Sequence, residues 1–202
     1  MRLTSVRALE LLEDARGKAE NDTWIDHCIC VGDTAAIIAK ELGMDEDKVR
    51  AMGYVHDIGK RYGYSAKIHH SVTGYEYLLE QGIDEEFACV CLTHSFLDNT
   101  VVCEAAGVLN ENMEKFDFLC DYVGSHEYDD YDRLINLCDL MCTRRMVGIE
   151  KRIVDLLLRY GVFPNTVNNL KATLKLKNYF DDLLGYNLYK LFPEEVLYND
   201  FK

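Results

Sequence analysis

Residues 51–60 read AMGYVHDIGK, a mostly apolar run that ends in an adjacent histidine and aspartate, His56 and Asp57. The apolar run predicts a helix, and Gly59 and Lys60 follow the pair. Neighbouring residues on a helix point about 100° apart, so both side chains can bind one cation only if it lies close to the helix end. Taken alone, the pair is equally well explained as a polar, capped helix end. The positions of the other histidines decide between these two interpretations.

Helical spacing of apolar residues continues on both sides of this run and predicts an all-α protein. The 202 residues include only two prolines, and few stretches alternate between apolar and polar residues as a strand would. The helices expected before residue 95, each with the residues expected to face the core, are 5–17 (Val6, Leu9 and Leu12), 24–42 (His27, Val31, Ala35 and Ile38), 46–57 (Val49, Met52 and Val55), 70–81 (Tyr75, Leu78 and Leu79) and 85–94 (Phe87, Val90 and Cys91).

The second half of the chain is less regular. Residues 95–130 predict irregular structure with one short helix around 111–122, and the acidic EYDDYD at 127–132 predicts a solvated loop. Three helical stretches follow Gly148 and contain no histidine or cysteine, so we expect them to be structural or to shape a substrate pocket. A helix is expected from Tyr131, with Asp139 embedded in it and with these residues facing the core: Leu134, Ile135, Cys138 and Met141.

The charge balance limits the kinds of partner. Lys and Arg number 22 against 35 Asp and Glu, which gives a formal net charge of -13. We therefore expect no nucleic-acid partner, whereas a small phosphorylated ligand fits if a bound cation reverses the local field. The start of the chain lacks the apolar core of a signal peptide, and no run of 18 apolar residues occurs. We expect a cytoplasmic protein without a membrane partner, and the oligomeric state stays open.

Eight cysteines are many for a chain of this length. They lie inside amphipathic runs, none forms a CxxC pair, and residues two apart on a helix face different directions. We therefore expect reduced thiols that act as small buried apolar side chains, in preference to a disulfide or zinc-finger framework. The eight are Cys28, Cys30, Cys89, Cys91, Cys103, Cys120, Cys138 and Cys142.

Six side chains, all expected at helix ends or on inward faces, make up a candidate metal site. Imidazole and carboxylate ligands together suit Zn, Mn, Fe or Co better than Ca, which prefers oxygen ligands alone. Six ligands exceed what one tetrahedral ion needs, so a site for two divalent transition-metal ions follows, with a carboxylate bridging ions roughly 3.5–4 Å apart. The six are His27, His56, Asp57, His70, His94 and Asp139.

The order of these residues resembles the H…HD…H…D pattern of the HD-domain metal-dependent phosphohydrolases. The resemblance covers about residues 20–145 and is carried by HCICVGDTAAIIAKELG, AMGYVHDIGK, CLTHS and LINLCDLM. The segment HSVTG at 70–74 is similar to the region of the extra histidine in the dinuclear branch, which includes the YqeK-like symmetrical dinucleoside tetraphosphatases. The chain lacks the HHExxDGxGYP segment of the cyclic-di-GMP phosphodiesterases, and LMCTRR stands where the YqeK-like pattern has a Glu-Pro element.

This resemblance implies an HD-domain helical bundle with a core of about five helices. Residues 1–145 would form the metal-binding domain, and residues 146–202 a C-terminal helical extension packed on it. His27, His56, Asp57 and Asp139 would surround one ion. His70 and His94 would hold the second, with Asp57 bridging the two.

The implied activity is hydrolysis of a phosphate ester or anhydride, and the expected substrate is a nucleotide. A metal-activated hydroxide would attack the phosphorus atom. Asp57, as a ligand of both ions, and Lys60 and Arg145, as contacts to the phosphate, are the residues expected to take part in catalysis. Lys60 follows the metal pair by one turn and is well placed to meet a phosphate oxygen. Arg145, in preference to Arg144, is expected to point into the pocket.

Several alternatives stay open. The same ligands would also suit a di-iron oxygenase or a non-catalytic domain that binds or regulates in a metal-dependent way. His69 would replace His70 as a ligand if the helix began in a different phase, and His126 is expected to be an exposed loop residue. Tyr62 and Tyr64 are candidates to line a nucleobase.

Overall fold

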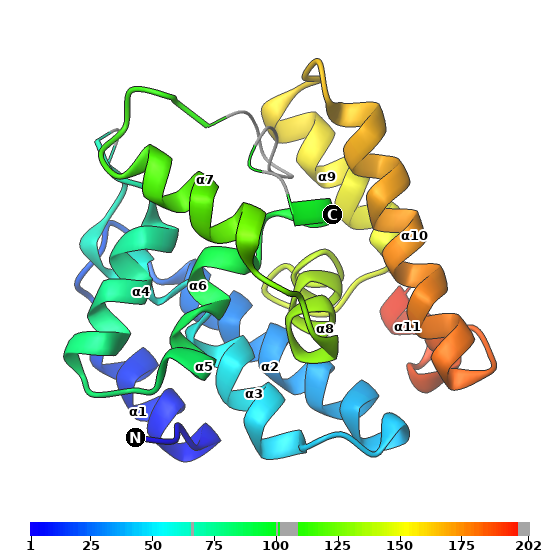
Figure 1. Ribbon diagram of the computed structural model, residues 1–202. Helices are drawn as coiled ribbons and strands as arrows, with labels where there is room; N and C mark the ends of the chain where they lie inside the picture. Colours follow the sequence, from blue (N-terminus) through cyan, green and yellow to red (C-terminus); the bar gives the residue numbers. More distant parts are fainter. Residues whose placement is uncertain (66, 100, 102–108, 198–202) are drawn as a thin grey trace.

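The computed structural model of the protein describes residues 1–65, 67–99, 101 and 109–197. Within these ranges it consists of helices and connecting loops without a strand, so the all-α prediction is confirmed (Figure 1). In chain order the α-helices are α1 (Ser5–Asp14), α2 (Thr23–Leu42), α3 (Glu46–Val55), α4 (His70–Glu80), α5 (Glu85–Ala88), α6 (Val90–Thr93), α7 (Phe116–Ser125), α8 (Asp130–Asp139), α9 (Ile149–Tyr160), α10 (Thr166–Leu184) and α11 (Glu194–Leu197), and the 3-10 helices are η1 (Ile58–Tyr62), η2 (Leu97–Asn99) and η3 (Leu188–Leu191).

Helices α2 and α3 form an antiparallel pair that touches at two glycines. A Cβ atom placed on Gly53 would lie 2.6 Å from the backbone nitrogen of Gly32, and one on Gly32 would lie 2.7 Å from the carbonyl oxygen of Arg50. No larger side chain fits either position, because real Cβ atoms do not approach other atoms so closely. The close crossing brings His27, near the start of α2, beside His56, which directly follows α3.

A third glycine joins the loop after α3 to the start of α4. A Cβ atom on Gly59 would collide with the carbonyl oxygen of His70 and would lie 2.6 Å from the backbone nitrogen of Gly74. Glycine at this position lets η1 pack directly on the first turn of α4. His70, the first residue of α4, is thereby held near the His56–Asp57 pair.

Two helix faces differ from those expected. Val6 is 69% exposed and Leu9 is 37% exposed, whereas the buried face of α1 consists of Ala8, Leu11 and Leu12. Leu79 on α4 is also exposed, and Tyr77 is buried instead. The buried faces of α1 and α4 are therefore rotated about the helix axis relative to the expected ones. On α1, small residues such as Ala8 allow close helix packing and can line a core face as effectively as leucine.

The prediction for residues 85–130 needs three corrections. The helix expected at 85–94 is divided into α5 and α6 at Cys89. The helix expected around 111–122 is α7, displaced toward the C-terminus. Finally, EYDDYD is not a solvated loop: Asp129 caps α8 by accepting from the backbone nitrogen of Asp132, and the Asp132 side chain accepts in return from that of Asp129. Acidic residues favour this position because they accept from the free N–H groups of a first helical turn.

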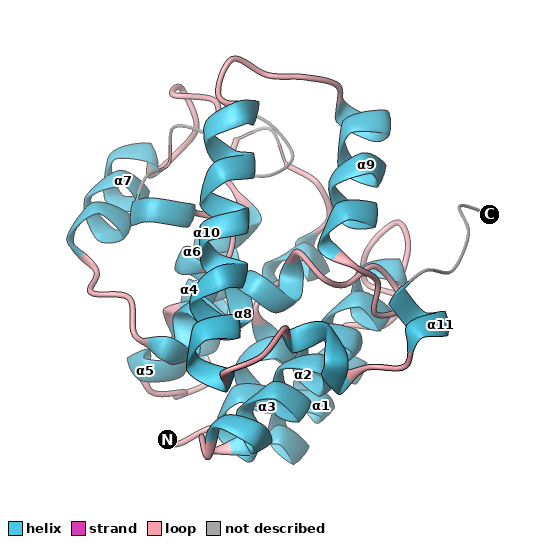
Figure 2. Cartoon of the chain, turned by 90° about the vertical axis from the view of Figure 1, so that its right-hand side faces the viewer, coloured by secondary structure: helices cyan, strands magenta, loops and turns pink. Residues whose placement is uncertain are grey.

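The C-terminal helices pack on the rest of the bundle. Both views show α9 and α10 running antiparallel and joined by a short loop (Figures 1 and 2). Phe180 of α10 and Leu188 of η3 are fully buried in the same apolar cluster as Ile25 of α2 and Leu134 of α8. The division of the chain at residue 145 stays a prediction.

The described cysteines agree with a reduced interior. All seven are free, and burial raises the pKa of Cys28, Cys91 and Cys138 well above the usual value. Cys103 lies outside the described residues. Among the helices described, none combines the length and the apolarity that crossing a bilayer requires.

Candidate metal centre

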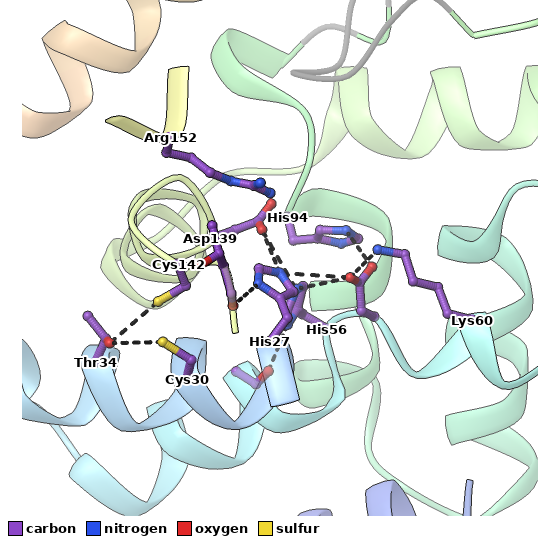
Figure 3. A network of polar contacts seen from close by, with 12 residues as sticks. His27, Cys30, Thr34, His56, Lys60, His94, Asp139, Cys142 and Arg152 are labelled. Carbon is purple, nitrogen blue, oxygen red and sulfur yellow. Dashed lines mark hydrogen bonds and ion pairs between the residues drawn. The ribbon is translucent and has the colours of Figure 1, made fainter. Parts of the chain in front are cut away.

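The six expected ligands converge on one place in the fold (Figure 3). They come from five parts of the chain, and each stands at or near the end of a helix. Helix ends at one side of the bundle therefore build the site. His27 lies in the first turns of α2, His56 and Asp57 directly follow α3, His70 begins α4, His94 follows α6, and Asp139 ends α8.

Asp57 lies at the centre of the group, with its side chain only 2% exposed. Its Oδ2 atom is 3.9 Å from Nε2 of His27 and 3.5 Å from Nε2 of His56. Its Oδ1 atom is 3.0 Å from Nε2 of His70 and 3.4 Å from Nε2 of His94. The two carboxylate oxygens thus divide the four histidines into two pairs.

Asp139 joins the first of these pairs. Its Oδ1 atom lies 2.9 Å from Nε2 of His27 and 4.0 Å from Nε2 of His56. Ligand atoms that share one ion at about 2.1 Å lie roughly 3–3.5 Å apart, so the spacing suits coordination. Two triads, His27–His56–Asp57 and Asp57–His70–His94, each have their ligand atoms within 4.8 Å of one another.

Backbone carbonyls orient three of the histidines. Nδ1 of His27 donates to the carbonyl of Thr143 at 3.1 Å, and Nδ1 of His56 donates to that of Gly53 at 2.7 Å. Nδ1 of His94 donates to the carbonyl of Cys91 at 3.0 Å. Because a carbonyl only accepts, Nδ1 carries the proton in each ring and the lone pair of Nε2 faces the site. Metal-binding histidines are typically held in this way.

Two of the imidazoles and both carboxylates are kept in the form that binds cations. Burial lowers the pKa of His56 to about 3 and that of His70 to about 4, so both rings are neutral at pH 7. Burial opposes ionisation of Asp57, but Lys60 and His56 hold the pKa of its carboxyl well below the usual value. Burial likewise opposes ionisation of Asp139, and the neighbouring His27 lowers its pKa.

Three polar atoms of the site are buried without a hydrogen-bond partner among the described residues: Nε2 of His56, Nε2 of His70 and Oδ1 of Asp57. Such atoms are costly in a folded protein, and native structures contain few of them. Here all three are lone-pair donors that face one another. The residues therefore fit divalent transition-metal ions, for which imidazole and carboxylate are suitable ligands.

The HD domain family matches residues 24–156 of the chain, which is more than half of its length. The chain belongs to the HD domain family. This membership confirms the family-level resemblance and places the chain in the superfamily of metal-dependent phosphohydrolases.

Curated relatives match shorter stretches. Ribonuclease Y of Pseudothermotoga lettingae is 34% identical over 70 residues, which are 35% of this chain and 14% of that protein. Ribonuclease Y of Thermosipho melanesiensis is 33% identical over 81 residues, 40% of this chain and 16% of the relative. An uncharacterized protein of Methanocaldococcus jannaschii is 36% identical over 79 residues, 37% of this chain and 46% of that protein. This HD chain thus spans less than half the length of these relatives. No solved structure matches it.

Lys60 of the HD domain pairs directly with Oδ2 of Asp57 and lies, with 39% of its side chain exposed, at the mouth of the site. Burial lowers the pKa of Lys60, but Asp57 outweighs burial and raises the pKa overall. The side chain is therefore a fixed positive charge beside the metal ligands. This is where the sequence predicted a contact to a phosphate oxygen.

An open cleft of about 1250 Å³ is lined by all the candidate ligands of the HD domain except His56. Arg144 and Arg145, which follow α8, both line it, so the cleft does not distinguish the expected Arg145 from its neighbour. Tyr62 and Tyr64 are exposed at 59% and 93%, and the aromatic side chains that line the cleft are Trp24 and Tyr160 instead. The cationic side chains along the cleft are Lys60, Arg144, Arg145, Lys151, Arg152 and Arg159.

Three of these cations, Lys151, Arg152 and Arg159, were not among the site residues expected from the sequence. They belong to α9, and nothing in the local pattern of α9 indicates that it borders the metal ligands. The seven-residue spacing of Arg152 and Arg159 places them two turns apart on one helix face, and this spacing could have indicated a shared role for the two arginines but not where they lie. The HD family match, which ends at residue 156, reaches into this helix.

The two remaining histidines of the HD domain lie outside the group of six. His69 is the N-cap of α4, and its Nδ1 accepts from the backbone nitrogen of Ser71 at 3.3 Å. His126 is not an exposed loop residue as expected: its side chain is 21% exposed, and its Nε2 lies 2.9 Å from Oδ2 of Asp132.

His126 and Asp132 also form a cluster with Cys89. The Asp132 carboxylate accepts from Thr93 Oγ1 at 3.0 Å as well as from His126, so both of its oxygens are already bonded. Burial raises the pKa of Cys89 to about 12, which keeps the thiol protonated. We therefore interpret this cluster as structural support for the start of α8.

Proposed function

We propose that this HD protein is a phosphohydrolase with a dinuclear metal centre that cleaves a phosphate ester or anhydride of a nucleotide. The observation that carries the proposal is the division of the four histidines between the two oxygens of Asp57. His27, His56 and Asp139 would share the first ion with Asp57. His70 and His94 would share the second.

Bound ions would make hydroxide available from water near neutral pH and would neutralise charge on the phosphoryl oxygens. The chain's own residues position the substrate. Lys60 offers a fixed positive charge at the edge of the ligand group, suited to a non-bridging phosphate oxygen. Arg145, which lines the cleft beside Arg144, would hold the remaining charge of the phosphate.

The charge and size of the cleft support a small nucleotide as the substrate class. Six cationic side chains line it, although the chain as a whole has a net charge of -13. A volume of about 1250 Å³ is ample for a mononucleotide or a dinucleotide. The relatives named ribonuclease Y suggest RNA as another substrate, but a polynucleotide would also meet the acidic surface outside the cleft. We therefore propose a small nucleotide.

Metal analysis followed by a substrate panel tests the proposal. The purified protein is expected to contain close to two ions per chain, and to release phosphate or a nucleotide from at least one of mononucleotides, cyclic nucleotides and dinucleoside polyphosphates. The panel is assayed with manganese and with cobalt. Oxygen consumption by iron-loaded protein without phosphate release would instead indicate an oxygenase. Bound metal without any turnover would indicate a binding or regulatory domain.

A further inference from the structure

We propose that α9 carries a second phosphate-binding subsite, formed by Arg152 and Arg159 and held in place by Asp155. This subsite would bind a phosphate group beyond the one attacked at the metal centre. The substrate would then be a nucleoside polyphosphate. The inference rests on the proposed function and specifies its substrate class.

The three residues lie on one face of α9. Nη1 of Arg152 donates to Oδ2 of Asp155 at 3.1 Å, and Nη2 of Arg159 pairs with the same oxygen. All three line the cleft together with Asp139. Figure 3 shows the Arg152 side chain extending from α9 toward Asp139. One carboxylate thus fixes two guanidinium groups at the wall of the cleft that leads to the metal ligands.

The charges on this face are incompletely balanced. Asp155 balances one of the two guanidinium charges and Asp139 faces Arg152, but each guanidinium has five N–H donors, of which Asp155 uses few. Arg152 is only 14% exposed, and its Nε atom is buried without a partner among the described residues. Keeping a largely buried cation with unmade hydrogen bonds is unfavourable. An anionic ligand with several oxygens would supply the acceptors.

The position of the pair favours a second phosphate of a small nucleotide. Lys60 pairs with Asp57 beside the candidate ligands, so it can contact a phosphate that reacts there. Arg159 lies further along α9 and next to Tyr160, whose ring is 5.3 Å from the guanidinium carbon and 48% exposed. A phosphate chain followed by a base would meet cations first and then an aromatic ring.

A binding experiment tests the subsite independently of turnover. The metal-loaded full chain is titrated with AMP and with the methylene-bridged analogue of ADP, which resists hydrolysis. Fluorescence of Trp24, the one tryptophan of the chain, reports binding because its side chain lines the cleft. The wild type is expected to bind the diphosphate about 10-fold more tightly than AMP, as one additional charge-assisted contact would produce.

The variant Arg152→Met/Arg159→Met is expected to lose this preference for the diphosphate. The control Arg7→Ala removes an exposed arginine that makes an equivalent (i, i+3) pair with Glu10 on α1, and it should keep the preference. An unchanged preference in the double variant would overturn the proposal, as would equal losses for AMP and for the diphosphate. A short oligoribonucleotide is the third probe. A larger loss for it than for the diphosphate would assign the subsite to RNA and reject the nucleoside polyphosphate.

Asp155 is a positioning residue, so its variant is tested separately, by comparing the KM values for two substrates. Asp155→Asn is expected to raise the KM for a diphosphate substrate several-fold while the KM for p-nitrophenyl phosphate changes much less. Equal changes in both would indicate a merely structural role and count against the subsite. Loss of folding is monitored by the thermal midpoint. Arg159→Met, which alters a side chain that is 47% exposed, provides a binding measurement even if the Arg152 variant unfolds.

The outcomes separate the subsite from the activity. If the wild type hydrolyses no substrate but the arginine variants still lose the preference for the diphosphate, the proposed function fails and the subsite stands. If the wild type hydrolyses nucleotides and the variants keep the preference, the function stands and the subsite fails.

Discussion

At the scale of single residues, one carboxylate organises the candidate centre. Asp57 is nearly inaccessible to solvent, it is approached by the Nε2 atoms of four histidines, and it pairs with Lys60. A buried carboxylate with so many nitrogen neighbours is stable as an anion only because those neighbours and Lys60 compensate its lost hydration. Changes at this residue should therefore affect metal content before they affect the fold.

Asp57→Ala is expected to remove most of the bound metal and all hydrolytic activity, because both proposed ions lose their shared ligand. The helical content should stay close to that of the wild type, since Asp57 follows α3 and makes no helix-capping bond. Elemental analysis and far-ultraviolet circular dichroism measure the two quantities. Asp132→Asn is the matched control: it alters another buried carboxylate, 4% exposed, and should keep the metal. Metal retained in Asp57→Ala would contradict the ligand assignment.

The pKa values of the histidines predict how the stability of metal-free protein depends on pH. Those of His56 and His70, about 3 and 4 in the fold, lie below the ordinary 6.5, so the unfolded chain binds more protons between pH 6.5 and 4. Stability is therefore present above pH 6.5 and is lost as the pH falls. Burial lowers the pKa of His94, but Asp57 raises it overall, so this ring is protonated in both states below pH 6.5 and affects the stability only above that pH. The two rings together lead to a loss that approaches about 2.7 kcal/mol per pH unit below pH 6.5.

Urea denaturation of chelator-treated protein at pH 7, 6 and 5 measures this dependence. The midpoint should move to lower urea concentration at each step. A midpoint that is constant, or that rises toward pH 5, would show that His56 and His70 are not buried in the neutral form.

At the scale of elements, contacts between backbones bring the ligands together. The Gly32–Gly53 crossing sets the distance between α2 and α3, and Gly59 sets that between η1 and α4. Each contact joins elements that carry candidate ligands, so the candidate metal site depends on positions that hold no such ligand themselves. A side chain at any of these glycines would push a ligand-bearing helix outward.

Gly59→Ala is expected to destabilise the fold by about 1–3 kcal/mol and to weaken the second metal site in particular, since the new methyl group collides with the carbonyl of His70. Denaturant titration gives the free energy of unfolding, and metal titration gives the stoichiometry, which should fall from two toward one. Gly124→Ala on α7 is the control, because a Cβ atom there meets nothing within 4 Å. It should be neutral or slightly stabilising. Equal effects of the two substitutions would refute the packing argument.

At the scale of the whole molecule, the C-terminal helices share the core of the HD domain. Phe180 and Leu188 are fully buried in the cluster that contains residues of α2 and α8, and α9 forms a wall of the cleft. The described residues after 145 therefore contribute both to the apolar core and to the charge of the candidate site. The two parts of the chain should unfold together.

Phe180→Ala is expected to lower the free energy of unfolding by about 3–5 kcal/mol, as large cavities in a core do. The change should be visible in the fluorescence of Trp24, which lies on α2 far from Phe180 in sequence, because the whole core unfolds as one unit. Leu174→Ala on the same helix is the control, since Leu174 is 47% exposed and its loss should cost little. A Trp24 transition that does not shift in Phe180→Ala would show that the C-terminal helices unfold separately.

The sequence by itself determined the helical class and the kinds of ligand. Apolar residues with helical spacing and few prolines are local properties, so the positions of α2, α3, α8 and α10 follow from short stretches of chain. The six histidines and aspartates could also be proposed as ligands from the sequence, because imidazole and carboxylate have the same chemistry in any fold. Helix faces were less certain, as α1 shows, because the neighbour against which a helix packs decides which residues are buried.

The resemblance implied how the six residues combine, but only the tertiary structure shows the contacts between them. It places His70 in the group and makes His69 a helix cap, it divides four histidines between the two oxygens of Asp57, and it brings the arginines of α9 to the same cleft. These relations join residues that lie far apart along the chain. No local pattern contains them, because they arise from the packing of one helix against another.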